Sequence, residues 1–142
     1  MAGTDKMSNG RVLCGSGTYA QLCEDEPFTF ENWCQALRRG TTFASTGAMI
    51  DLRAEGTQMG GEIRLPGNGG TVEVVATAES IWPLTAVVPV VNGQRVAREA
   101  ADGDRRMVTI KFDLKAERSC WVGARCWGDY YTDSGPVMAH SS

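Results

Sequence analysis

The residues of this chain that could carry hydrolytic chemistry are few and widely spaced. His140 is the one histidine in 142 residues, and a zinc site normally needs several convergent histidine, cysteine or carboxylate ligands. A Cys–His nucleophilic pair that uses His140 has no local motif to support it. Gly15-Ser16-Gly17 resembles a nucleophile elbow only loosely, because the G-x-S-x-G spacing is absent. A small esterase with a serine or cysteine nucleophile is therefore the least supported of the functions these residues allow.

The cysteines fit a structural role better than a metal site. Cys120 and Cys126 lie six positions apart on one face of a predicted strand, too far along it to hold a single metal ion. Free cysteine is among the residue types most often buried. We expect both to be small core residues.

A third group of candidates is aromatic and lies near the C-terminus. Trp121, Arg125 and Trp127 share one face of a predicted strand, and Tyr130 and Tyr131 follow. Such side chains can form a platform that contacts a sugar or a protein partner. Alternatively, the tryptophans pack against the sheet or under a helix. A stand-alone carbohydrate- or protein-binding module is therefore one of the functions we consider.

These candidates must be positioned by a sheet, because period-two alternation dominates the chain after Thr41. A buried central strand is predicted over Ala86–Val91, although Pro89 belongs on an edge or at a bulge, and Asn92-Gly93 predicts a type I′ hairpin turn. The other predicted strands are Thr18–Leu22, a unit around Ile50–Ala54, Glu62–Leu65, Thr71–Ala78, Gln94–Arg98, Met107–Leu114 and Ser119–Gly128. The fold class that follows is mainly β: an antiparallel, immunoglobulin-like β-sandwich.

One helix is predicted, over 27–39 in the N-terminal part. Asp25 or Glu26 caps it, and Gly40 ends it. Its apolar face, made of Phe30, Trp33, Cys34 and Leu37, is expected to cover a sheet.

Composition narrows the class and the cellular setting. A length of 142 residues suits one domain or one domain plus a small appendage. The net charge of −3 argues against nucleic acid or an anionic membrane as the default partner. Five cysteines, an odd number in irregular spacing, favour a reducing, cytoplasmic location over a disulfide framework.

Several short motifs, taken in order, resemble a known family. They are Ala2-Gly3-Thr4-Asp5, Thr18-Tyr19, Phe30-x-x-Trp33-x-x-Ala36-Leu37-Arg38-x-Gly40-x-Thr42-Phe43, Ser45-Thr46-Gly47-Ala48-Met49-Ile50-Asp51-Leu52, Val91-Asn92-Gly93, Ser119-x-Trp121-Val122-x-Ala124-Arg125 and Ala139-His140-Ser141-Ser142. The series spans essentially the whole chain. It is similar to the C-terminal portion of the CehA/McbA group of metallohydrolases, which is related to the PHP phosphoesterase-like superfamily.

The resemblance implies a division of the chain and a site. Residues 1–40 correspond to the last piece of a catalytic domain, and 41–142 to a β-sandwich. Asp5 matches the aspartate near the family's metal site, where the metal is zinc, manganese or iron, although Met7 stands where a histidine often follows. His140 falls in a C-terminal Ala-His-Ser/Thr-Ser pattern and is the second catalytic candidate. The parent enzyme is expected to cleave ester, carbamate or phosphoester-like bonds in a small-molecule substrate.

The resemblance also implies that the chain alone has little or no turnover. The earlier metal ligands of the family are missing from these 142 residues, and one aspartate does not build a dinuclear site. A further strand after Ser142 is expected in the family. An open sheet edge and an exposed helix face would then favour a homo-oligomer.

Overall fold

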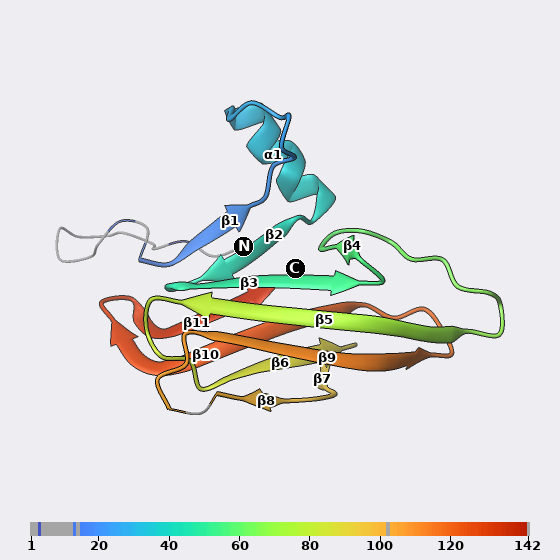
Figure 1. The fold of residues 1–142 in the computed structure, drawn as a ribbon. Coiled ribbons are helices and arrows are strands. Elements are labelled where there is room, and N and C mark those ends of the chain that lie inside the picture. The colour runs from blue at the N-terminus through green and yellow to red at the C-terminus, as the bar shows by residue number, and fades with distance from the viewer. Residues whose placement is uncertain (1–2, 4–12, 14, 102, 142) are drawn as a thin grey trace.

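Two antiparallel sheets pack face to face in a computed structural model of the chain, which describes residues 3, 13, 15–101 and 103–141 (Figure 1). The larger sheet has the order β1 (Gly17–Ala20), β2 (Thr42–Ser45), β11 (Gly135–Ser141), β10 (Val122–Thr132), β6 (Ala86–Val91) and β7 (Gln94–Arg95), with β8 (Glu99–Ala100) also paired to β6. The smaller sheet has the order β4 (Thr57–Gln58), β3 (Ala48–Ala54), β5 (Gly70–Ser80) and β9 (Met107–Ala116). For the described residues, the prediction of a mainly β, antiparallel sandwich with one helix is confirmed, and its immunoglobulin-like type stays a prediction.

The core lies between the sheets because alternation turns every second side chain of each strand inward. In β5 the predicted inward set is buried: Val72, Val74, Ala76 and Ala78. Ala76 pairs with Leu52 on one side and with Ile110 on the other, so that β3, β5 and β9 present one continuous apolar surface. The larger sheet covers it with Phe43, Val87, Ala124, Cys126, Val137 and Ala139.

Strand β6 is buried on both of its faces, as predicted for a central strand. Pro89 is accommodated because β7 and β8 pair with β6 only near its two ends. Pro89 lies between these two paired ends, so the ladder needs no N–H from it there. On the same edge of β6, the Pro89 carbonyl oxygen accepts a 3.2 Å hydrogen bond from the Val96 N–H. Asn92 and Gly93 then turn the chain with φ of 49° and 83°, which confirms the predicted hairpin turn.

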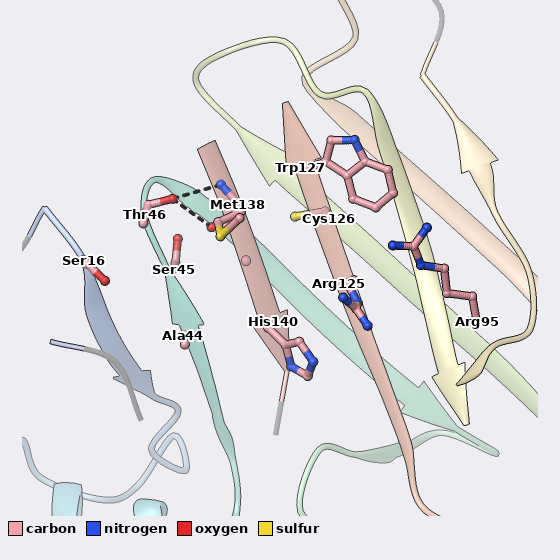
Figure 2. Close-up of a pocket in the computed structure, with 11 residues that line it drawn as sticks. Ser16, Ala44, Ser45, Thr46, Arg95, Arg125, Cys126, Trp127, Met138 and His140 are labelled. Carbon is pink, nitrogen blue, oxygen red and sulfur yellow. Dashed lines mark hydrogen bonds between the residues drawn. The ribbon is translucent and has the colours of Figure 1, made fainter. Parts of the chain in front are cut away.

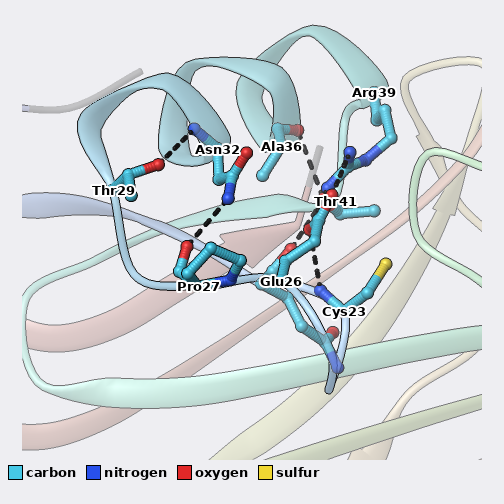
Figure 3. Close-up of polar contacts among 9 residues, drawn as sticks. Cys23, Glu26, Pro27, Thr29, Asn32, Ala36, Arg39 and Thr41 are labelled. Atoms are coloured by element: carbon cyan, nitrogen blue, oxygen red, sulfur yellow. Dashed lines mark hydrogen bonds and ion pairs between the residues drawn. The ribbon is translucent and has the colours of Figure 1, made fainter.

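The helix begins later than predicted. α1 spans Phe30–Arg39, and its N-cap is Thr29, whose hydroxyl oxygen accepts a hydrogen bond from the Asn32 N–H. The predicted start at residue 27 with an acidic cap is therefore wrong. Glu26 instead accepts two 2.9 Å hydrogen bonds from the Arg39 guanidinium, which joins the segment before the helix to the last turn (Figure 3). Gly40 ends the helix at φ 77°, as predicted.

The helix does not cover a sheet, and that prediction is also wrong. β1 and β2 are antiparallel neighbours, with Ala20 opposite Thr42, so the segment that joins them must leave and re-enter at the same end of the sheet. α1 therefore lies beyond the ends of these strands (Figure 1). Among its residues only Ala36 is buried, and Phe30 is 80% exposed.

Three further strand predictions need correction. The segment 62–65 is loop, because Gly60 before it packs against the end of α1 and Gly69 after it packs against the end of β9. The strand predicted from Ser119 begins at Val122 and continues to Thr132. The strand predicted over 94–98 is only β7, because after Val96 the chain turns away towards β8.

The expected division at residue 40 stays a prediction. β1, which precedes that position, pairs with β2, which follows it, so the larger sheet runs across the boundary. Within the described ranges, the structure contains no helix with the length and apolar character needed to span a membrane.

Candidate ligand-binding hollow

A hollow of about 310 Å³ lies on the outer face of the larger sheet, the face turned away from the core (Figure 2). Alternation along β10 explains its position, since Ala124 and Cys126 point into the core and Arg125 and Trp127 point outward. The side chains that give it chemical character are those of Ser16, Thr46, Arg95, Arg125, Trp127, Met138 and His140.

The register of the strands sets these side chains side by side. Arg125 pairs with His140 across β10 and β11, and Trp127 pairs with Met138 in the next outward row. Directly opposed side chains on one face of a sheet have Cβ atoms about 5 Å apart. The hollow thus has a row with a guanidinium and an imidazole and, beside it, a row with an indole and a thioether.

Arg95 reaches the same face from β7. It pairs with Val90, which in turn pairs with Gly123 on β10, two residues before Arg125. Gly123 contributes no side chain there. A Cβ at that position would lie 3.5 Å from the ring of Trp121 and 3.9 Å from the ring of His140. Figure 2 shows the guanidinium groups of Arg95 and Arg125 on the same side of the sheet as Trp127.

The charges in the hollow are not balanced by the protein groups that the structure describes. The Nε of Arg125 is buried and has no hydrogen-bond partner among the described residues. None of the described residues that line the hollow is acidic. The ion pairs found in the described ranges involve other cations, namely Arg39, Arg53, Arg64 and Lys111. Because a buried donor without an acceptor costs free energy, the arrangement favours an incoming anion.

His140 contributes one more polar group. Its Nδ1 lies 2.5 Å from the Ser141 carbonyl oxygen. A carbonyl oxygen only accepts, so Nδ1 carries a proton. Nε2 then remains for other partners, as an acceptor in the neutral ring and as a donor in the cation.

The hollow does not have the geometry of an esterase site. Ser16 and His140 both line it, but β2 lies between β1 and β11, so they are not neighbours in the sheet. Cys126 also lines the hollow, and its predicted burial is confirmed at 2% exposure. Burial raises the pKa of the Cys126 thiol to about 11, which leaves little nucleophilic thiolate near neutral pH.

The structure separates the predicted aromatic platform. Trp127 lines the hollow, whereas Trp121, which lies near Gly123, lines a second cavity at the end of the sandwich. Tyr130 stacks on Trp82 with ring centroids 5.1 Å apart, and Tyr131 is 72% exposed on the far part of β10.

Cys120, predicted as a core residue, is exposed. The reason is that β10 begins only at Val122, so alternation does not extend back to residue 120.

The residues around His140 do not suit a divalent metal ion. Its cross-strand neighbour is the cation Arg125, and the described lining offers no carboxylate. Across the described ranges, no three histidine, cysteine, aspartate or glutamate residues gather into a metal-binding group. Asp5, the predicted metal ligand, lies outside the described residues.

Sequence reasoning placed Arg125 and Trp127 on one face but missed Arg95, Thr46 and Met138. The only signal for Arg95 was its place two residues after the Asn92-Gly93 turn, which sets it opposite Val90. Comparison with protein-family models, with curated proteins and with solved structures found no match for this chain.

Proposed function

We propose that this protein is a β-sandwich binding module that holds a small organic anion in the hollow on the outer face of its larger sheet. The observation that supports this most directly is the buried Nε of Arg125, which has no partner among the described residues. Arg95 and His140 line the same hollow, and its described lining has no acidic group.

Carboxylate and phosphate are the anionic groups that fit best. A guanidinium presents donors in a planar fork that matches the oxygens of either group. Two arginines and one imidazole would surround such a group, while the ring of Trp127 and the side chain of Met138 would contact an apolar body. The ligand class is therefore an organic acid or phosphate monoester with a flat or compact apolar part.

Phenyl phosphate and phenol form a matched pair of probes, because they share the ring and differ in charge. We expect titration calorimetry to detect phenyl phosphate and to show at least about tenfold weaker binding of phenol, since a hydrogen bond to a charged group contributes about 1.5–3 kcal/mol. Arg125→Ala should weaken phenyl phosphate binding by about the same factor. Arg98→Ala is the control, because it removes the same charge from an exposed position outside the lining. This variant should change the affinity for phenyl phosphate less than about twofold. Equal effects of the two variants would contradict the proposal.

Three sequence-based expectations stay predictions. A metallohydrolase parent is supported by the sequence resemblance alone. Self-association through an exposed sheet edge or through the helix face is the second, and the exposure of Phe30 supports the helix face. A cytoplasmic location is supported by the irregular cysteine spacing.

A further inference from the structure

A second and larger cavity, of about 1010 Å³, lies at the end of the sandwich where β3 and β9 finish and β5 and β10 begin. Its floor is the inner surface of both sheets and is apolar. Leu52, Met59 and Val72 on that floor are at most 6% exposed, and Leu114 and Val122 continue it. The space is partly open to solvent, so a small molecule could enter it from outside.

The loop that borders this cavity is fixed at both ends. Gly60, at φ 80°, packs so closely on the Arg39 carbonyl at the end of α1 that a Cβ there would overlap it. Gly69, at φ 79°, packs in the same way on the Ala116 carbonyl at the end of β9. Each end is also closed by a turn, with the Gly61 N–H bonded to the Gln58 oxygen and the Gly69 N–H to the Pro66 oxygen. The rim is therefore held in place rather than free to collapse onto the floor.

The charged groups of the rim cancel one another. Glu62 and Arg64 lie 3.6 Å apart as an ion pair, and Glu117 and Arg118 are adjacent in the chain. An anion or cation would gain little from such a rim, whereas an apolar molecule would contact the floor. We propose that this cavity is a second binding site, independent of the outer hollow, for an uncharged and mainly apolar small molecule such as a medium-chain alcohol.

Two cysteines allow a direct test with n-octanol as the probe. Cys120 lines the cavity and is exposed, and Cys23 is exposed elsewhere. We expect n-octanol to slow the alkylation of Cys120 by iodoacetamide at least about fivefold, because an occupied cavity restricts access to the thiol. The rate of alkylation is measured by peptide mass spectrometry. Alkylation of Cys23 should not change. An unchanged rate at Cys120, or equal slowing at both cysteines, would overturn the proposal.

A variant that fills the cavity, compared with the same substitution outside it, gives a second test. Ala54 lines the cavity, whereas Ala100 is exposed on β8 outside it. Ala54→Phe should abolish the protection of Cys120, and Ala100→Phe should preserve it. Persistence of protection in Ala54→Phe would count against the site.

The unaltered protein provides a second readout that does not depend on a variant folding. In methyl-labelled methionine NMR spectra, n-octanol should shift the Met59 methyl signal and leave that of Met138, which lines the outer hollow. Phenyl phosphate should leave the Met59 signal unchanged. A shift of the Met138 signal alone with n-octanol would refute the second site while leaving the first untouched.

Discussion

Arg125 and His140 occupy directly opposed positions on β10 and β11, on the surface of the larger sheet that faces away from the core. Neither residue has an acidic partner in the described lining of the hollow. The Arg125 guanidinium therefore lies without a counter-charge there, and an anion bound beside it would supply one. Because such a ligand would bind the folded state, its binding should stabilise the fold.

Ligand-dependent stability gives the first prediction. A ligand that binds only the folded state raises the unfolding free energy by about 2.7 kcal/mol at one hundred times its dissociation constant. Saturating phenyl phosphate should therefore raise the midpoint of thermal unfolding of the wild-type protein by several degrees. The same addition should give a much smaller shift in Arg125→Ala. A shift of equal size in both proteins would place the binding site elsewhere.

The close packing of Gly60 gives a prediction about stability. Alanine at Gly60 would adopt a left-handed conformation and overlap the Arg39 carbonyl, whereas Gly56, at φ 74°, has open space around it. Gly56→Ala should cost about 1–2 kcal/mol in urea unfolding for the conformation alone. Gly60→Ala should cost roughly 1–3 kcal/mol more because of the overlap. Similar losses in the two variants would mean that the rim loop is not held against the helix end.

The Glu26–Arg39 pair predicts a pH dependence. The hydrogen bonds from Arg39 lower the pKa of the Glu26 carboxyl below its ordinary value of 4.5. The resulting stabilisation is present above that ordinary value and is lost as the pH falls through the lowered pKa. Glu26→Gln should therefore lower the thermal midpoint slightly at pH 6–7, with the difference vanishing on acidification. Glu24→Gln, at an exposed neighbouring position, is the matched control and should show no such trend.

The thiol of Cys126 should be nearly inert. With a pKa of about 11, its thiolate fraction at pH 8 is only about one part in a thousand. In the folded protein at pH 8, iodoacetamide should label Cys23 and Cys120 while Cys126 stays unmodified. Labelling of Cys126 should appear when urea unfolds the chain. Rapid labelling of Cys126 in native buffer would contradict its burial.

Alternation along single strands was readable from the sequence, and the relations between distant strands were not. The inward sets of β5 and β9 followed from period two, as did the common face of Arg125 and Trp127. The pairing of β10 with β11, which brings His140 beside Arg125, depends on packing between segments whose order in the sheet no local pattern fixes. The position of α1 was also not readable from the sequence. Its apolar face predicted burial against a sheet, but the pairing of β1 with β2 places the helix beyond the ends of these strands.

The hydrolase resemblance is tested separately by elemental analysis of the purified protein. Near-stoichiometric zinc, manganese or iron that falls in Asp5→Ala would support a metal site in the N-terminal segment. Because Arg95, Arg125 and His140 supply the groups proposed to hold the anion, this variant should bind phenyl phosphate as the wild type does. Loss of both metal and phenyl phosphate binding in Asp5→Ala would contradict the separation of the two sites.

The most direct test of anion binding is to observe the Arg125 Nε–H group itself. In arginine-labelled NMR spectra, phenyl phosphate should shift the Arg125 Nε–H signal in a saturable way, because that buried donor gains an acceptor. The Arg98 signal should stay in place, and phenol should leave both signals unchanged. An Arg125 signal that does not respond to phenyl phosphate, or that responds equally to phenol, would contradict the proposal that this hollow binds an anion.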